Sequence, residues 1–538
     1  MDLSILIPAR NEMFLKQTVE NILKNIRGNT EIIVVLDGAT ADPKLEDNSK
    51  LHVINHSTSI GQRAATNEAA TISTAEFIMK LDAHCAVDEG FDVKLMSNCE
   101  PKWTVIPRMY NLHAFDWVCK TCGNRTYQGP TLKECAKCKG IEIYRDILWK
   151  PRFNRETDFA RFDSSLHFQY WTDYRKRPEA QGAISDVMCC VGAGWFMRRK
   201  RYWEIEGMDE NHGSWGQMGV ELACKSWLSG GRQVVNKNTW FAHMFRTQGG
   251  DFGFPYHQPG RAVEHARKYS RNMWEGNNWS LAIRPFNWIL NKFKPIPDWP
   301  EPEPLPTKGI VYYTDNRGDP AILETVRKKI DTSRNGHELV SVSLQPIDFG
   351  KNITLPLERS RLAMFKQILA GLETCSSDVV FLCEHDVLYH PSHFDFIPPR
   401  KDVYYYNENV YKVDAKTGQA VFYWTKQTSG LCAYRELLLE HYRKRVAKVE
   451  AEGYDHSLGY EPGNHPPPRG LDNVPAKRWM SEVPNVDIRH GCNLTATRWD
   501  PSQFRDKNTC LGWTLVDEIP GWGVTKGRFT EFLAGVGA

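Results

Sequence analysis

The sequence predicts an α/β protein made of two units that each contain a parallel sheet. Short apolar runs that end in acidic residues alternate with segments of helical period, which is the order typical of a doubly wound sheet. A proline-rich stretch, 295–308, separates a first unit, 1–294, from a second, 309–538. Two pairs of closely spaced cysteines indicate a small insertion at about 115–142 in the first unit.

The bulk composition is typical of folded globular protein. Of the 538 residues, 41% are hydrophobic and 25% are charged, and this length exceeds what one core supports. The net charge is only +3, so a polyanionic partner would have to meet a local basic patch. No apolar run reaches the roughly 18 residues of a membrane span. Because a strand opens the chain and leaves no room for a signal peptide, we expect a cytoplasmic protein.

The first unit is expected to begin with alternating strands and helices. Strands are predicted at 3–7, 31–37, 51–55 and 77–81, and helices at 12–25 and from 61 onward. The first helix keeps its apolar residues at the 3.6-residue period. The continuous apolar run of the second strand suits a central parallel position. The glycine signatures of dinucleotide and ATP sites are missing from the sequence.

Asp82 and His84 follow the strand at 77–81 and stand two residues apart, so their side chains point the same way. At the carboxyl end of a central strand, a carboxylate and an imidazole can form half of a divalent-metal site. The alternative is an ordinary pair of loop residues, and only the rest of the chain distinguishes the two interpretations.

Four motifs of the first unit resemble those of the GT-A nucleotide-sugar transferases. They are Leu6–Glu12, Val34–Gly38, Gly61–Asn67 and Leu81–Cys85. The Asp-x-His form is similar to that of the polypeptide N-acetylgalactosaminyltransferases, more than to the Asp-x-Asp of the broad family-2 enzymes. The resemblance implies a GT-A fold, a UDP-sugar donor and a bound Mn²⁺ or Mg²⁺.

The same resemblance implies roles for individual residues. Asp37 would hold the nucleoside, and Asp82 and His84 would hold the metal on the diphosphate. Arg63 and Asn67 would complete the nucleotide-sugar site.

Three later segments continue the resemblance. They are Val191–Glu210, Trp215–Gly231 and Ala242–Arg246. The last is similar to the Gly-His-Ile-Phe-Arg motif of the family, whose histidine completes the metal site, and this implies that His243 is the third ligand. The expected acceptor-side residues are Gly192, Gly194 and Trp215.

The chain departs from the family pattern at Met218 and Gly219, where relatives carry a carboxylate. If the enzyme inverts the sugar configuration, its base is expected to be Glu221, Asp209, Glu210 or a residue from elsewhere. If it retains the configuration, no protein base is demanded. The sequence leaves this choice open, and Glu221 is also consistent with a solvated helix position.

The insertion carries two Cys-x-x-Cys pairs, formed by Cys119, Cys122, Cys135 and Cys138. Four thiolates at this spacing predict a tetrahedral, structural Zn²⁺ site. The insertion is also basic, with Lys120, Arg125, Lys133, Lys137 and Lys139. Two interpretations stay open. The zinc site either stabilises a segment that has no hydrophobic core of its own, or it supports a basic surface that contacts a phosphate backbone.

The second unit repeats the pattern of the first. A strand at 309–315, a helix at 360–373 and an apolar strand at 378–383 lead to Glu384 and Asp386. We expect a second GT-A-like domain with these two acids and His490 as candidate metal ligands, or a degenerate domain that only binds the acceptor. The run Met480–Asp506 resembles domains of bacteriophage-encoded sugar transferases, which would place the protein in a host cytoplasm.

Together these features predict a metal-dependent glycosyltransferase that moves a sugar from a UDP-sugar to a hydroxyl group. The preferred acceptor is a hydroxymethylated pyrimidine in DNA, because the zinc ribbon is basic and the second unit is phage-like. One alternative is a bifunctional polysaccharide or glycan synthase. An alternative of another class is a nucleic-acid-binding protein whose transferase domain is inactive, which the change at Met218 and Gly219 would explain.

Overall fold

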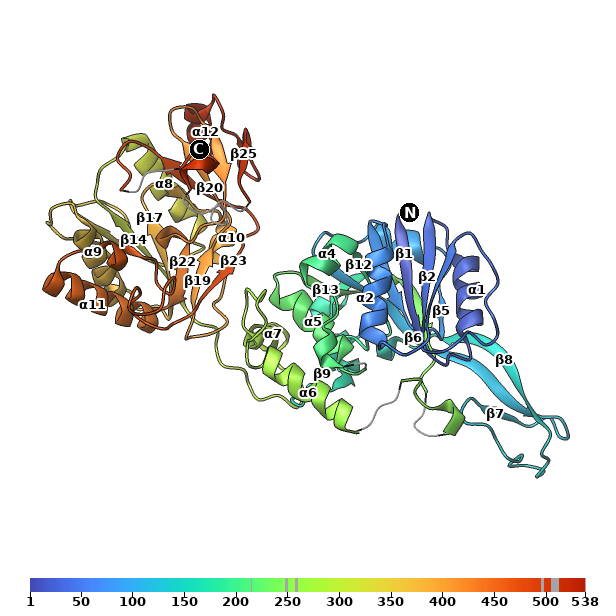
Figure 1. The fold of residues 1–538 in the computed structure, drawn as a ribbon. Coiled ribbons are helices and arrows are strands. Elements are labelled where there is room, and N and C mark those ends of the chain that lie inside the picture. Colours follow the sequence, from blue (N-terminus) through green and yellow to red (C-terminus); the bar gives the residue numbers. More distant parts are fainter. Residues whose placement is uncertain (214, 247–249, 257–259, 495–497, 505–511, 538) are drawn as a thin grey trace. The chain divides into compact units, whose positions relative to one another are not determined.

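The computed structural model describes residues 1–213, 215–246, 250–256, 260–494, 498–504 and 512–537. It divides into two compact units, one made of residues 1–282 and 286–303 and the other of residues 283–285 and 304–538 (Figure 1). Among the described residues, no helix is long and apolar enough to span a membrane. The α/β fold class predicted from the sequence is confirmed.

The first unit is built on one large sheet with the strand order β11-β13-β6-β12-β4-β1-β2-β3. Its strands are β1 (Leu3–Ala9), β2 (Thr30–Asp37), β3 (Leu51–His56), β4 (Phe77–Leu81), β6 (Trp103–Cys119), β11 (Ile184–Asp186), β12 (Gly194–Arg198) and β13 (Arg232–His243). Strands β1 to β4 are mutually parallel, and β12 runs antiparallel to β4.

Helices cover both faces of this sheet because side chains alternate along each strand. Ile5 and Ile7 of β1 pack with helix α1 (Leu15–Asn25). Leu6, on the opposite face, packs with α2 (Gln62–Ile72) and α5 (Met218–Leu228). The remaining helices are α3 (Phe91–Met96), α4 (Arg199–Glu204), α6 (Gly260–Trp274) and α7 (Phe286–Phe293). The helix predicted from residue 12 begins at Leu15.

The cysteine insertion lies at the end of a long hairpin. Strand β6 continues past the sheet and pairs with β7 (Arg125–Tyr127) and β8 (Ile143–Arg152). Figure 1 shows this hairpin projecting from the large sheet of its own unit. Smaller strands of the unit are β5 (Cys85–Val87), β9 (Ala160–Phe162) and β10 (Phe168–Tyr170). Part of the proline-rich stretch packs on this unit, where the Trp299 indole N–H donates to the Phe162 carbonyl at 3.0 Å.

The second unit contains a sheet with the order β16-β15-β14-β17-β22-β19-β23 and a smaller one with the order β18-β24-β20-β21-β25. The first comprises β14 (Lys308–Thr314), β15 (Glu338–Ser343), β16 (Lys351–Thr354), β17 (Val379–Glu384), β19 (Tyr404–Asn407), β22 (Leu431–Tyr434) and β23 (Ala476–Trp479). The second comprises β18 (Val387–Leu388), β20 (Val410–Asp414), β21 (Ala420–Phe422), β24 (Asn485–Arg489) and β25 (Thr514–Val516).

Helices also cover both faces of the larger sheet of this unit. Helices α9 (Arg361–Thr374) and α11 (Arg435–Glu452) share one core. Helices α8 (Pro320–Ser333) and α12 (Phe529–Gly537) share the other, and α10 (Pro391–Phe394) adds Phe394 to it. Of the run Met480–Asp506, for which the sequence predicts a likeness to phage-encoded transferases, residues 495–497 and 505–506 lie outside the described residues.

Candidate functional site

Three predicted metal ligands come together at the carboxyl end of the first unit's sheet. Asp82 follows β4, and its backbone N–H donates to the Ala193 carbonyl at 2.8 Å. His84 precedes β5, which pairs antiparallel with β13 in a register that sets His243 opposite Cys85. Strand ends from three parts of the chain therefore bring these side chains to one place.

The distances among the three side chains suit a shared cation. His84 Nε2 lies 3.0 Å from His243 Nε2, and His243 Nε2 lies 3.3 Å from Asp82 Oδ2. One candidate ligand atom from each residue lies within 4.8 Å of the others. A carboxylate oxygen and two imidazole nitrogens are a donor set that binds Mn²⁺ and related divalent metals.

Neighbouring side chains orient these ligands. Glu12 Oε2 lies 3.1 Å from His84 Nδ1 and also pairs with Arg246, which leaves the other ring nitrogen of His84 to face the cluster. Asp82 Oδ1 accepts from Gln62 Nε2 at 3.1 Å and from the Lys80 ammonium, so Oδ2 is the oxygen that faces His243. A carboxylate behind a ligating histidine is the usual outer support of a metal site.

The charge states of the cluster also fit metal binding. Burial lowers the pKa of His243 to about 4, so its ring is neutral at pH 7. Burial opposes ionisation of Asp82, but the Lys80 ammonium and the imidazoles of His243 and His84 outweigh it, and the pKa of Asp82 lies well below its usual range. A neutral imidazole and an ionised carboxylate are the forms that ligate metals.

A pocket of about 470 Å³ opens beside the cluster. Its aromatic lining residues are Phe168, Trp215, Phe245, Phe254 and Tyr256, and its basic lining residues include Lys80, Arg246 and Arg267. Trp215 packs against Phe254, with ring centroids 5.5 Å apart. The aromatic wall can contact the apolar face of a sugar ring, and the cations can contact phosphate.

Two of the predicted acceptor-side residues, Gly192 and Trp215, line this pocket, whereas Gly194 is not among its lining residues. A Cβ at Gly194 would lie 2.9 Å from the Phe241 ring, so this glycine permits packing inside the sheet. A Cβ at Gly219 would lie 1.7 Å from the Cys190 carbonyl oxygen. Residue 219 therefore packs against 190–192 too closely to carry a side chain, whereas Met218 beside it carries one and lines the pocket.

The structure does not bring the three candidate bases to the pocket. Glu221, Asp209 and Glu210 are all missing from its described lining residues. The Asp209 carboxylate accepts from the Tyr269 hydroxyl at 2.8 Å, and Glu210 accepts from Asn67 at 2.8 Å. Both acids therefore stabilise the turn that precedes α5.

Glu221 is completely buried. It lies 2.9 Å from Arg63 Nε and 3.1 Å from Lys225 Nζ, and it accepts from the Asp209 N–H at 2.6 Å. Burial opposes ionisation, but the charges of Lys225 and Arg63 lower the pKa of Glu221 to about 2. The solvated helix position considered from sequence is wrong for this residue, because its charge is compensated inside the core.

Three residues predicted to bind the nucleotide-sugar instead form hydrogen bonds with the protein segments around the site. Asp37 accepts from the N–H groups of Ile60 and Gly61 at 2.5 and 3.0 Å. Arg63 donates to the carbonyls of Gly213 and Gly216, at 3.0 and 2.6 Å. The Asn67 amide oxygen accepts from the Tyr202 hydroxyl at 2.6 Å.

Sequence reasoning assigned no role to several side chains that line the pocket, namely Glu12, Gln62, Lys80, Arg246 and Arg267. Glu12 and Arg246 stand at the ends of two of the recognised motifs. Lys80 lies two residues before Asp82 on β4 and so points the same way. The position of Glu12 and Arg246 within motifs, and the two-residue period of the strand for Lys80, could therefore have identified these three residues from the sequence.

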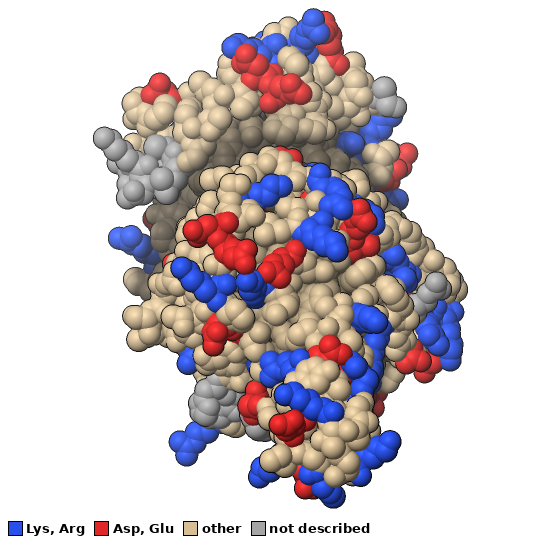
Figure 2. Space-filling view, turned by 90° about the vertical axis from the view of Figure 1, so that its right-hand side faces the viewer, with Lys and Arg blue, Asp and Glu red and all other residues tan. Residues whose placement is uncertain are grey.

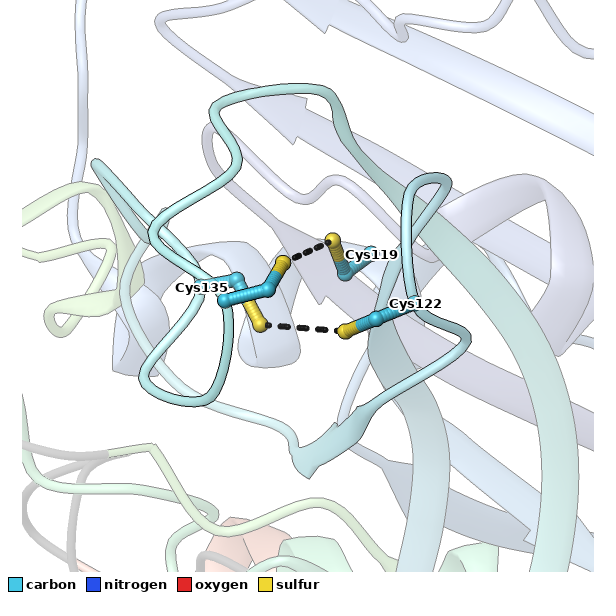
Figure 3. Close-up of side chains that lie close together, drawn as sticks. Cys119, Cys122 and Cys135 are labelled. Atoms are coloured by element: carbon cyan, nitrogen blue, oxygen red, sulfur yellow. Dashed lines mark hydrogen bonds between the residues drawn. The ribbon is translucent and has the colours of Figure 1, made fainter.

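The four cysteines of the insertion form a second cluster (Figure 3). The Cys119 and Cys138 sulfurs lie 3.5 Å apart, and those of Cys122 and Cys135 lie 3.7 Å apart. Tetrahedral Zn–S bonds of about 2.3 Å would set sulfurs about 3.8 Å apart. Hydrogen bonding from the Cys122 backbone lowers the pKa of Cys119 to about 6, which favours the thiolate form.

The second unit also has a cluster of candidate ligands. His385, Asp386 and His490 each offer an atom within 4.8 Å of the others. The predicted Asp386 and His490 thus come together, with His385 as the third member. Glu384 accepts from the Tyr313 hydroxyl at 2.5 Å, and burial together with the Asp386 charge raises the pKa of Glu384.

Comparisons with known proteins match part of the chain. Residues 4–111 match the family model described as Glycosyl transferase family 2. Polypeptide N-acetylgalactosaminyltransferase 3 of Drosophila melanogaster is 27% identical over 142 residues, which cover 25% of this chain and 20% of that protein. The Homo sapiens protein of the same name is 22% identical over 259 residues, which cover 46% of this chain and 37% of that protein. The chain thus spans less than half the length of these relatives.

Two solved structures show low overall similarity. A crystal structure of GalNAc-T7 with UDP, GalNAc and Mn²⁺ is 18% identical, with a TM-score of 0.38, and the match covers 51% of this chain and 48% of that one. A crystal structure of S. aureus TarS 1-349 in complex with UDP-GlcNAc is 13% identical, with a TM-score of 0.31, and the match covers 55% and 71%. The glycosyl transferase family 2 resemblance expected from the motifs is confirmed for residues 4–111.

Proposed function

We propose that the first unit transfers a sugar from a UDP-sugar to a hydroxyl group and that Asp82, His84 and His243 hold a divalent cation, Mn²⁺ or Mg²⁺, for this reaction. The observation that carries the proposal is the convergence of these three side chains beside a pocket with aromatic and basic walls. The family match over residues 4–111 and the transferases similar to this chain support the donor class.

Each side chain has a separate task in this proposal. The bound cation would neutralise the negative charge that grows on the diphosphate as its bond to the sugar breaks. Glu12 fixes the ring of His84. Lys80 and Arg246 add positive charge close to the leaving group. Trp215 and Phe254 shield the reacting centre from water and contact the sugar.

We further propose that the reaction retains the anomeric configuration. Glu12 and Asp82 are the carboxylates among the described residues that line the pocket, and both belong to the metal arrangement. No further carboxylate of that lining is left to deprotonate an acceptor. We expect an α-linked product from an α-linked donor, which proton NMR of the product measures; a β-linked product would require a base that this proposal does not contain.

The metal role is tested by turnover of UDP-sugars. We expect activity in Mn²⁺ that disappears in EDTA and falls by at least about 100-fold in Asp82→Ala, because a key electrostatic stabiliser is lost. Glu89→Gln is the control, since Glu89 is an exposed acid between β5 and α3 that pairs with Arg27. Equal activity of Asp82→Ala and the control would refute the metal role.

For the insertion, we propose a structural Zn²⁺ held by the four cysteines. The sulfur–sulfur distances and the presence of four thiols, the full ligand set of a tetrahedral structural Zn²⁺, support a closed site. Elemental analysis is expected to find one zinc per chain in the wild type and none in Cys135→Ser. Retention of zinc by that variant would contradict the assignment.

The proposed acceptor remains a hydroxymethylated pyrimidine in DNA. In the insertion, Arg125 pairs with Asp116 and Asp146, and Lys139 pairs with Glu134. Lys120, Lys133 and Lys137 are exposed and supply the charge that would contact phosphate. Figure 2 shows basic and acidic side chains interspersed over the visible face, so these lysines would act as a local contact.

Transfer of radiolabelled sugar to hydroxymethylated duplex, with an oligosaccharide as the competing acceptor, separates the hypotheses. We expect the label to appear in the DNA. We also expect the affinity of the protein for duplex DNA to weaken as the salt concentration rises. Label only in the oligosaccharide would favour the glycan synthase. Salt-sensitive DNA binding without any transfer would favour the nucleic-acid-binding protein.

A further inference from the structure

We propose that the second unit carries a second divalent-cation site, formed around Asp386, His490 and His385, which binds a phosphorylated ligand. The cation site is inferred from the residues of the second unit alone. The ligand class, a nucleoside diphosphate, rests in addition on the proposed function of the first unit.

The two units repeat one arrangement of strands. The order β3-β2-β1-β4-β12-β6-β13 in the first unit corresponds to β16-β15-β14-β17-β22-β19-β23 in the second. In both, the first four strands are parallel, the fifth is antiparallel to its neighbours, and the last two are parallel to each other. The two sheets therefore offer the same edge at the carboxyl ends of their central strands.

Individual hydrogen bonds repeat as well. After the antiparallel strand, the N–H of Arg199 donates to the Glu76 carbonyl at 2.8 Å, and the N–H of Arg435 donates to the Asp378 carbonyl at 2.8 Å. Each accepting residue immediately precedes the strand that leads to its cluster, β4 or β17. The match is thus one of residue register as well as strand order.

The register identifies equivalent positions in the two clusters. In the first unit the Met244 N–H donates to the His84 carbonyl at 3.1 Å, and in the second the Ile488 N–H donates to the Asp386 carbonyl at 2.8 Å. Asp386 is therefore equivalent to His84. By the same alignment Asp487 is equivalent to His243, and Glu384, two residues before Asp386, is equivalent to Asp82.

At these equivalent positions the second unit has three carboxylates, those of Glu384, Asp386 and Asp487. The imidazoles of its cluster belong to neighbouring residues, His385 and His490. His490 follows β24, and its Nε2 lies 3.6 Å from Asp386 Oδ2. The His490 side chain is 8% exposed, and this nitrogen has no hydrogen-bond partner among the described residues. A buried imidazole nitrogen that faces a carboxylate without a hydrogen bond is a position that a cation would satisfy.

The surrounding pocket is suited to an anion. Four arginines line it together with His385 and Asp386 of the cluster, namely Arg359, Arg361, Arg445 and Arg489. Arg445 Nε is buried without a partner among the described residues. Guanidinium groups bind phosphate oxygens in a forked geometry, so a cation on the acids and phosphates on the arginines would compensate each other.

Mn²⁺ binding to the whole protein tests the proposal. One equivalent of Zn²⁺ first fills the cysteine site and unbound Zn²⁺ is removed, because excess Zn²⁺ would compete with Mn²⁺ for carboxylate and imidazole ligands. We expect two bound Mn²⁺ per chain, counted by electron paramagnetic resonance of free Mn²⁺. Asp386→Asn and His490→Gln should each weaken one site by at least about tenfold, since even outer-shell changes have effects of this size. Glu358→Gln, an exposed acid beside the pocket, is the control.

The same titration separates this proposal from that for the first unit. Asp82→Ala should remove the other Mn²⁺ and leave the site of the second unit intact. If the wild type binds only one Mn²⁺ per chain, and neither Asp386→Asn nor His490→Gln changes that binding, the second site does not exist. This conclusion does not depend on the result for Asp82→Ala. UDP should tighten Mn²⁺ binding to the Asp82→Ala variant; no effect of UDP there would overturn the ligand class. Circular dichroism of each variant verifies that it is folded.

Discussion

The two candidate metal clusters occupy equivalent places in two similar sheets, yet they use different side chains. In the first unit, the strand register sets Asp82, His84 and His243 side by side. In the second, the corresponding positions are Glu384, Asp386 and Asp487, and His490 comes from the loop that follows. The difference teaches that topology fixes where a site can form, while the residues at the strand ends decide which ligand chemistry it has.

A second difference concerns positive charge. Lys80 stands two residues before Asp82 and contacts it, whereas Leu382 stands two residues before Glu384. The second unit instead places arginines in its pocket. Breaking individual contacts in each unit therefore tests whether the two sites work independently.

The largest expected effect is on the stability of the first unit. Glu221→Ala leaves Arg63 and Lys225 buried without their carboxylate, which should cost about 3–5 kcal/mol. Differential scanning calorimetry should show a lower transition for the first unit and an unchanged one for the second. Glu204→Ala is the control, because Glu204 is a half-exposed acid on α4 with two longer ion pairs, at 3.8 and 3.7 Å. A shift of both transitions would mean that the units unfold together.

The next effect is on turnover. Loss of the Asp82 carboxylate should lower the first unit's activity by at least about 100-fold, or about 2.7 kcal/mol of transition-state stabilisation. Asp386→Asn should leave the first unit's Mn²⁺ affinity unchanged. If Asp386→Asn weakens both Mn²⁺ sites equally, the clusters are coupled and the comparison of two separate sites fails.

A smaller effect is expected behind the metal ligands of the first unit. Glu12→Gln removes the charge that orients His84, and Mn²⁺ affinity there should fall by about 10- to 100-fold. Isothermal titration with Mn²⁺ measures this, and Glu20→Gln on the exposed face of α1 is the control. If Glu12→Gln binds Mn²⁺ as tightly as the control, the Glu12 carboxylate is not needed to orient His84.

The smallest effect is that of mild acid. Burial lowers the pKa of His212 in the first unit to about 4 and that of His393 in the second to about 3. Because the unfolded chain binds these protons at about pH 6.5, stability falls as the pH drops through the window between that value and each folded pKa. From pH 7.5 to 6, each histidine should cost less than about 1 kcal/mol. Urea unfolding at both pH values is the measurement; greater stability at pH 6 would contradict the sign.

Much of the first unit could be predicted from local patterns. The strands at 3–7, 31–37 and 77–81 are visible as apolar runs, and the structure contains all of them. The three candidate metal ligands could be found because they stand at strand ends inside recognisable motifs. Their convergence depends on register between strands, which the motif order implies but no single motif contains.

The roles of Glu221 and Arg63 could not be predicted in this way. Their contact joins residues 158 positions apart, and the helical period gives no sign of it. The hydrophobic residues around Glu221 indicate burial only once α5 is known to be covered on every side. In the second unit, His490 belongs to an irregular loop, where neither strand nor helix period constrains the direction of a side chain.

The close packing of Gly219 against the Cys190 carbonyl has a consequence for enzyme engineering. A designer who wished to install an acidic side chain at residue 219 could not do so by point mutation alone, since every residue with a Cβ would collide with main-chain atoms there. The segment at 190–192 would have to be rebuilt at the same time, so a carboxylate at this position requires a redesigned backbone.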